Sequence, residues 1–228
     1  MSTTPRKGLP PSRKRLATPR KRLTGEERRA AILDCALRVF AERGYHASSI
    51  DDIAREGGIS KALIYEHFVS KQGLYAELLE RHASELFDRL AAIPAADQAG
   101  SVRLRVGVDA FYGFVEDHRV AWQMLFREAT DPEVAMVLDR IVSQVTALVA
   151  ALIAEDPGSR ASEDGDETRA ARTQMLAHLV VGAVQSLANW WADHQEVRRE
   201  RIVEMTMEFA WLGLERLSRG ERWSIATP

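Results

Sequence analysis

The chain has 228 residues, of which 46% are hydrophobic and 28% charged, a composition typical of a folded protein of one or two domains. This composition excludes a fully disordered chain and a collagen-like fibre, and the single cysteine, Cys35, excludes a domain held by internal disulfides. There is no charged-then-apolar leader, and we find no apolar run of the roughly 20 residues that span a bilayer. We therefore expect a cytoplasmic protein that does not contact a membrane.

Charge is unevenly divided along the chain, although the net charge is only −2. Residues 1–71 contain 15 basic and 8 acidic residues, whereas the rest of the chain contains 16 basic and 25 acidic residues. Residues 1–71 thus have a net charge of +7, and the rest of the chain has a net charge of −9. This asymmetry is expected of a DNA-binding head attached to a body with another task, although a solvated basic tail accounts for part of it.

The first 23 residues contain four prolines and eight basic residues but no acidic residue, so we expect them to be disordered. Such a segment is either a solubilising tail or an arm that reaches into a groove of DNA. Residues 24–70 are expected to form a helix-turn-helix domain, residues 71–220 a larger helical body, and residues 221–228 a short tail.

From Thr24 onward the apolar residues recur at helical spacing, and the pattern predicts an all-α fold. Thr24 and Ser49 are expected N-caps, and Ser49 with Asp52 forms a sequence like a capping box. The acid-rich residues 155–166 predict a flexible connection, because they lack the ligand order of a calcium loop. Helices are expected at residues 24–44, 49–57, 60–68, 70–93, 101–117, 121–129, 132–154, 167–193 and 196–219.

Residues 48–71 predict two short helices joined by a turn at Gly57 and Gly58, which is a helix-turn-helix arrangement. Apolar residues are spaced to pack both helices against the preceding one: Ile50, Ile53, Ala54, Ile59, Ile64 and Phe68. The outward side carries small, apolar and hydrogen-bonding residues, which can approach base edges closely: Lys61, Ala62, Leu63, Tyr65, Glu66 and His67.

This segment resembles the TetR family of bacterial transcriptional regulators. The resemblance extends from about Glu27 to Leu78 and depends on an ordered set of residues: Ile32-Leu33, Ala36, Phe40, Gly44-Tyr45, Ser49-Ile50, Ile53-Ala54, Gly58-Ile59-Ser60, Tyr65, His67-Phe68, Lys71 and Leu74. It implies an N-terminal three-helix DNA-binding domain followed by a helical bundle for ligand binding and dimerisation. It also implies a double-stranded DNA operator as partner.

The resemblance implies that the third helix is the recognition helix and that Ser49 and Lys71 contact phosphates at two helix starts. The expected DNA-binding set is Ser49, Ser60, Lys61, Ala62, Leu63, Tyr65, His67 and Lys71. Leu63 is expected to make apolar contact, for example with a thymine methyl. Glu66 either accepts a hydrogen bond from a cytosine amino group or lies at the rim, and Tyr65 either contacts DNA or braces the turn.

A single recognition helix binds weakly, so we expect a homodimer that reads a pseudo-palindromic operator. Two apolar stripes on the last two helices are candidates for its interface: Val181, Val184, Ala188 and Trp191, and then Ile202, Met205, Phe209 and Leu212. Either stripe could instead line the core of one protomer, and the resemblance favours a four-helix interface.

The acidic body shows no catalytic motif, and its histidines are scattered without metal-ligand spacing, so we expect neither an enzyme nor a metal site or cofactor. The resemblance implies a small hydrophobic effector: an acyl chain or acyl thioester, a lipophilic drug or an aromatic metabolite. Candidate pocket residues combine aromatic and polar types. They are Phe111, Phe114, Trp122, Phe126, Met175, His178, Gln185 and Asn189, with His118 as a further polar group.

These features predict a ligand-responsive transcriptional regulator. The fourth helix would act as a lever that connects the DNA-binding head to the effector pocket. Repression with release by the effector is the commoner family behaviour, and activation is the alternative with the opposite sign. A different alternative is an architectural DNA-binding dimer that responds to no effector.

Overall fold

The computed structural model describes residues 24–93, 98–126, 132–155 and 166–218. Within these ranges the fold is all-helical without a strand, which confirms the predicted fold class. The expected tails, 1–23 and 221–228, and most of the expected connection at 155–166 lie outside the described residues. The helical elements are α1 (Gly25–Arg43), α2 (Ile50–Gly57), α3 (Lys61–His67), α4 (Lys71–Leu90), α5 (Gly100–Asp117), α6 (Arg119–Ala121), the π-helix η1 (Trp122–Phe126), α7 (Pro132–Glu155), α9 (Asp166–Ala192) and α10 (Arg199–Ser218).

Local capping sets the helix starts in the N-terminal part. The Thr24 hydroxyl accepts a hydrogen bond from the Glu27 N–H, and the Glu27 carboxylate accepts one from the Thr24 N–H. Ser49 and Asp52 form the same reciprocal capping box at α2. Gly58, with φ of 60°, ends α2 in the left-handed conformation that glycine adopts without a steric penalty. The expected turn of the helix-turn-helix is thereby formed.

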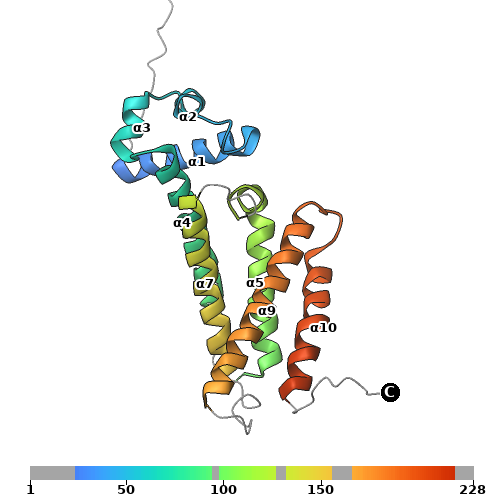
Figure 1. Cartoon of the computed structure of the whole chain (residues 1–228). Helices are drawn as coiled ribbons and strands as arrows, with labels where there is room; N and C mark the ends of the chain where they lie inside the picture. The colour runs from blue at the N-terminus through green and yellow to red at the C-terminus, as the bar shows by residue number, and fades with distance from the viewer. Residues whose placement is uncertain (1–23, 94–97, 127–131, 156–165, 219–228) are drawn as a thin grey trace, which may run out of the picture.

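The helices α1, α2 and α3 form a small head at one end of the molecule (Figure 1). Its core contains the apolar residues that the sequence pattern assigns to it, including Ile32, Phe40, Ile53, Ile64 and Phe68, all of them buried. The side-chain spacing in α2 and α3 therefore directs one face of each short helix onto α1, and leaves the other face exposed.

Helix α4 leads from the head into the body (Figure 1). Its 20 residues give a length of about 30 Å. The helix ends at Leu90, three residues earlier than expected. Ala91 and Ile93 continue as a turn whose N–H groups donate to the Phe87 and Leu90 carbonyls. An early end is consistent with Pro94, since proline disfavours helical backbone in the residue before it.

The body is a bundle in which α7 packs against α9, α10 packs against α5, and α4 packs against both α5 and α7. The expected helix at 121–129 is the one substantial difference in the described body. In its place α6 is a single turn and continues into η1, a π-helix. π-helical turns are rare and are often found at functional sites.

Helix α7 has a segment, Val134–Glu155, that is long and apolar enough to cross a membrane by length and composition alone. In the structure its apolar side chains line an internal cavity, and the helix packs against α4 and α9. The cavity thus accounts for one apolar face of the helix, although only 17% of the segment is buried within the described structure.

Candidate functional site

Helix α3 presents an exposed surface at the outer edge of the head (Figure 1). Ser60 caps it by accepting a hydrogen bond from the Leu63 N–H at 3.1 Å. Lys61, Ala62, Tyr65 and Glu66 are exposed, and Tyr65 keeps 55% of its surface accessible. Leu63 and His67 are half-buried beside them. The structure therefore brings the predicted recognition residues onto one accessible face, where a DNA groove can approach them.

The two residues expected to contact phosphate also have roles within the head. The Ser49 hydroxyl accepts from the Asp52 N–H and donates to the Asp52 carboxylate at 2.5 Å. The Lys71 ammonium donates to the backbone carbonyls of Tyr45 and Ser48 at 2.8 and 2.9 Å, and lies 4.2 Å from the centre of the Tyr45 ring. Lys71 thereby fastens the loop between α1 and α2 to the start of α4. Phosphate contacts by Ser49 and Lys71 remain predictions.

The body contains a partly open cavity of about 170 Å³ between α4, α5, η1, α7, α9 and α10. Of the eight expected pocket residues, Phe111, Trp122, Phe126 and Gln185 line it. Aliphatic side chains of α7 form much of the remaining wall and were not expected from the sequence: Ile141, Val142, Val145, Leu148, Val149, Leu152 and Ile153.

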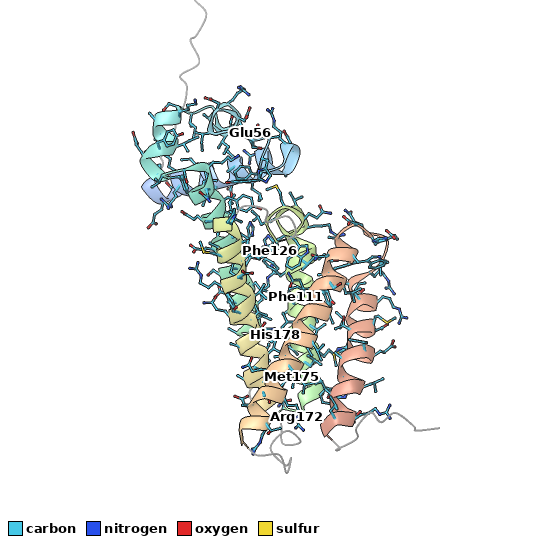
Figure 2. The ribbon with its side chains drawn as sticks, in the orientation of Figure 1. Glu56, Phe111, Phe126, Arg172, Met175 and His178 are labelled. Atoms are coloured by element: carbon cyan, nitrogen blue, oxygen red, sulfur yellow. The ribbon has the colours of Figure 1, made fainter. Side chains whose placement is uncertain are left out.

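The other four expected pocket residues do not line the cavity, and the prediction is wrong for them. Met175 and His178 lie on the exposed face of α9 (Figure 2). The nearest positions of α9 that line the cavity are Leu176 and Val180, which point to another side of the helix. Phe114 is buried behind the cavity, with its ring 4.9 Å from His118 and 6.2 Å from Phe126. Asn189 accepts a hydrogen bond from the Trp122 indole N–H at 3.1 Å, so it positions a lining residue.

Two arginines lie at one end of the cavity. Arg103 and Arg172 both contribute to the lining, at the first turn of α5 and near the start of α9. Arg103 is buried and its guanidinium donates to Glu155 at 2.6 Å. Its Nε has no hydrogen-bond partner among the described residues. A buried guanidinium N–H without a partner is costly, and an anionic ligand group would satisfy it.

The roof of the cavity is connected to the DNA-binding head. Trp122 and Phe126 of η1 line the cavity with stacked rings 5.0 Å apart. Between them in sequence, Met124 accepts a 2.6 Å hydrogen bond through its backbone carbonyl from the buried Tyr75 hydroxyl of α4. The Tyr75 ring in turn contacts Phe40 and Tyr45 of the head edge-on.

The head and α4 are joined by further side-chain bonds. The Arg29 guanidinium of α1 pairs with both carboxylate oxygens of Glu77 on α4 and donates to the His67 carbonyl at the end of α3 at 2.7 Å. The Glu77 partner raises the pKa of Arg29 against a smaller opposing effect of burial. Arg81 of α4 pairs with Asp34 of α1 at 2.9 Å. These bonds join two positions of α1 and the end of α3 to α4.

The expected dimer stripes are only partly exposed. Val184, Ala188, Trp191 and Ile202 are buried inside the protomer, and Val181 and Val184 line the cavity, so these five residues are corrected from interface to interior. Met205, Phe209 and Leu212 are exposed, as a dimer surface requires. The outward face of α9 carries other apolar residues that the sequence pattern did not single out for this role: Met175, Leu179 and Trp190.

Comparisons with known proteins agree with this arrangement. Residues 32–78 match the model for bacterial regulatory proteins of the tetR family, and residues 101–213 match that for the tetracyclin repressor-like C-terminal domain. The chain is 34% identical over 196 residues to the HTH-type transcriptional activator FasR of Mycolicibacterium smegmatis, covering 85% of each chain. Names of activators and of repressors both occur among the relatives.

Two solved structures have a similar fold. A TetR-like transcriptional regulator from Rhodococcus sp. RHA1 is 26% identical, with a TM-score of 0.71 over 85% of this chain and 99% of that one. The transcriptional regulator FadR of Bacillus subtilis, solved in complex with stearoyl-CoA, is 18% identical, with a TM-score of 0.60 over 85% of this chain and 99% of that one. TetR-family regulators bind DNA and act as dimers. The chain belongs to the TetR family of bacterial regulatory proteins and is a DNA-binding transcriptional regulator and not an enzyme.

Proposed function

We propose that the chain is a cytoplasmic homodimeric regulator whose operator affinity changes when its cavity binds a long acyl chain with an anionic head group, such as an acyl thioester of coenzyme A. The observation that carries this proposal is an apolar cavity with arginines at one end and the roof element η1 at the other. An architectural dimer would need no such cavity, so the cavity favours an effector-responsive protein.

The dimensions of the cavity favour an extended ligand. Along α7 the lining residues extend from Ile141 to Ile153, which corresponds to about 18 Å at the helical rise per residue. Most of these residues are aliphatic, whereas a site for a flat aromatic metabolite would favour facing aromatic walls. Three of the four aromatic lining residues, Phe111, Trp122 and Phe126, belong to α5 and η1, and the fourth is Trp211 of α10.

The charge at the other end favours an anion. Arg103 and Arg172 together can receive a carboxylate or phosphate, because guanidinium groups form charge-assisted, often bidentate, hydrogen bonds with such groups. The regulator FadR of Bacillus subtilis, which shares the fold, was solved with stearoyl-CoA, a ligand of this chemistry. A neutral lipophilic drug would leave the arginine Nε without a partner.

The signal would pass from the cavity to DNA through η1 and α4. A ligand that displaces Trp122 or Phe126 displaces Met124, whose carbonyl holds the Tyr75 hydroxyl of α4. Since Arg29 and Arg81 join α4 to the head, the recognition helix α3 would follow. In a dimer this movement would change the separation of two α3 helices, which must be about 34–36 Å to enter successive major grooves.

We propose that α9 and α10 form the dimer interface with their exposed apolar faces. Six large apolar side chains on these faces have at least 42% of their surface accessible: Met175, Leu179, Trp190, Met205, Phe209 and Leu212. Gly182 and Gly213 lie on the same helices with open space above them, which would let a partner helix approach closely. Contiguous exposed apolar surface of this kind marks an interaction site.

The sign of regulation depends on where the operator lies relative to the promoter. The Mycolicibacterium relative, which matches 85% of this chain, is named an activator. A repressor-named relative from Rhodococcus jostii matches over a shorter stretch of 89 residues. Activation is therefore the first sign to test, with a promoter–reporter fusion carrying the selected operator.

The effector proposal is tested by native mass spectrometry and operator titration. An operator is first selected from a random duplex library. The dimer is then titrated with palmitoyl-CoA, palmitate and coenzyme A alone. We expect one palmitoyl-CoA per protomer, no retention of coenzyme A, and weaker acyl-CoA binding in Arg103→Gln. The matched control is Arg105→Gln, because Arg105 is exposed two residues further along α5. Equal affinity of both variants for palmitoyl-CoA would contradict the assigned head-group site.

A further inference from the structure

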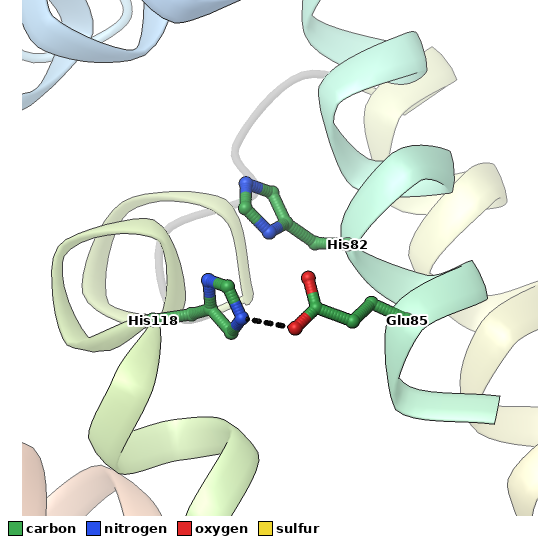
Figure 3. Close-up of side chains that lie close together, drawn as sticks. All are labelled: His82, Glu85 and His118. Carbon is green, nitrogen blue, oxygen red and sulfur yellow. Dashed lines mark hydrogen bonds and ion pairs between the residues drawn. The ribbon is translucent and has the colours of Figure 1, made fainter. Parts of the chain in front are cut away.

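Two histidines and a glutamate that are far apart in sequence come together where α4 meets the end of α5 (Figure 3). His82 and Glu85 are three positions apart on α4, so they lie on one face of that helix. His118 is the C-cap residue of α5. Ligand-type atoms of the three residues all lie within 4.8 Å of one another. The sequence predicted no metal site because its histidines are scattered, and the fold removes that objection for these two.

His82 is the unusual member of this group. It is 5% exposed, yet neither ring nitrogen has a hydrogen-bond partner among the described residues. Burial, with smaller contributions from Arg81 and His118, lowers its pKa to about 4. Among the described residues, nothing explains a buried imidazole with two unpartnered nitrogens, because packing alone would be better served by an apolar side chain.

Glu85 and His118 already form a hydrogen-bonded pair. His118 Nε2 lies 2.7 Å from Glu85 Oε1, and the Arg89 guanidinium donates to the same oxygen at 2.8 Å. Partial burial works against the charged carboxylate, but the bonds from His118 and Arg89 outweigh it and lower the pKa of Glu85. The Glu85 carboxylate thus lies close to both imidazoles.

We propose that His82, Glu85 and His118 form a binding site for one divalent transition-metal ion, best matched by Zn²⁺, with water as a fourth ligand. Zinc takes imidazole nitrogen and carboxylate oxygen at about 2.0–2.2 Å in tetrahedral geometry. Ligand atoms of a tetrahedral zinc site lie about 3.3 Å apart. An ion would therefore replace the proton that His118 and Glu85 share at 2.7 Å and separate these two atoms slightly, while the His82 ring lies 5.0 Å from that of His118. An ion pair between His118 and Glu85 explains those two residues without a metal, but it leaves His82 unexplained.

The position of the site suggests its consequence. A metal held there would fasten α4 to the junction between α5 and α6. Its ligand Glu85 directly precedes Leu86, which lines the cavity. The ion would therefore restrain α4, the helix that carries the DNA-binding head. Arg89 competes for Glu85, since its guanidinium pairs with the same carboxylate.

The experiment uses the full chain without a purification tag. The protein is titrated with Co²⁺ and followed by visible absorption, and Zn²⁺ affinity is measured by competition with a chromogenic chelator. We expect one ion per protomer and an intense tetrahedral Co²⁺ spectrum that Zn²⁺ abolishes. Saturable binding is expected to weaken at least ten-fold in His82→Gln and His118→Gln. The matched control is His178→Gln, because His178 is exposed on α9, and it should bind as the wild type does.

Arg89→Gln supplies an independent test in the opposite direction. Removing the competing guanidinium should tighten Zn²⁺ binding, which a general loss of packing would not do. Circular dichroism checks that each variant is folded. If His82→Gln does not fold, the affinity of His118→Gln for Zn²⁺ tests the proposal. The proposal is overturned if the wild type binds no stoichiometric ion, or if His118→Gln and His178→Gln retain equal affinity.

Discussion

The hydrogen bond between the Tyr75 hydroxyl and the Met124 carbonyl is the contact through which cavity and head should communicate. Tyr75 is 2% exposed and lies 2.6 Å from its acceptor. Tyr75→Phe removes only the hydroxyl and leaves the ring contacts with Phe40 and Tyr45 in place. The variant should therefore retain the fold and the operator-binding surface while losing the link between α4 and η1.

The magnitude follows from the burial of both groups. Loss of a buried hydrogen bond that leaves its carbonyl without this donor should lower the free energy of unfolding by about 1–3 kcal/mol. Coupling between an effector site and a DNA site is commonly worth about 1–3 kcal/mol, or about 5–150-fold in affinity. If Tyr75 transmits most of that coupling, the coupling free energy between effector and operator in Tyr75→Phe should be less than half of the wild-type value.

Fluorescence anisotropy with labelled operator, with and without saturating palmitoyl-CoA, measures this coupling. The control is Tyr112→Phe, which also removes a buried hydroxyl, bonded at 2.9 Å to Thr206, but at a contact between α5 and α10 distant from the head. Both variants should lose comparable stability, and only Tyr75→Phe should lose coupling. Wild-type coupling in Tyr75→Phe, or equal loss in both variants, would refute the assigned route.

Four further predictions concern other parts of the structure. Phe209→Asp places a charge on a side chain that is 72% exposed on α10 and should give monomers in sedimentation experiments and abolish tight operator binding; a dimer of wild-type stability would exclude this face. Arg29→Ala removes the bonds to Glu77 and the His67 carbonyl and should lower the free energy of unfolding by about 1–2 kcal/mol in urea titrations, whereas an unchanged midpoint would mean that these bonds add nothing. Burial raises the pKa of Tyr112 to about 12, so the neutral phenol contributes fully to the free energy of unfolding below pH 10, and this contribution is lost as the pH rises from 10 toward 12. Tyr112→Phe should make the free energy of unfolding depend less steeply on pH in that range. An equally steep dependence in the variant would show that Tyr112 is not its cause. Val145→Trp fills part of the cavity and should block palmitoyl-CoA binding in native mass spectrometry, while Ala147→Trp on the exposed face of α7 should not; equal binding by both would place the ligand elsewhere.

The sequence predicted the head well because its signals are local. Capping pairs such as Thr24 with Glu27 and Ser49 with Asp52 act within three residues, and the structure forms both. The helix-turn-helix core also followed from spacing, since α2 and α3 each have one apolar face and one neighbour to pack against.

The body was less predictable because α9 and α10 are apolar on more than one face. On α9, one face lines the cavity at Val180, Val181 and Val184, while Met175 and Leu179 on another face are exposed. Periodicity identifies both faces but cannot assign one to a ligand and the other to a partner, and this is why Trp191 was expected at the interface and Met175 in the pocket.

The polar groups of the body depend on contacts between distant segments. Arg103 meets Glu155 from the far end of α7, and His118 meets Glu85 from α4. No spacing rule connects such positions in a single sequence. The π-helix η1 was likewise expected to be an ordinary helix, because the apolar pattern of residues 122–126 fits either form.

The central claim is that an acyl ligand in the cavity changes the affinity of the dimer for its operator. The most direct measurement is a titration of the selected operator with wild-type protein, free and saturated with palmitoyl-CoA, with occupancy verified by native mass spectrometry. We expect the dissociation constant to change by at least about five-fold. An unchanged dissociation constant at full occupancy of the cavity would contradict the account.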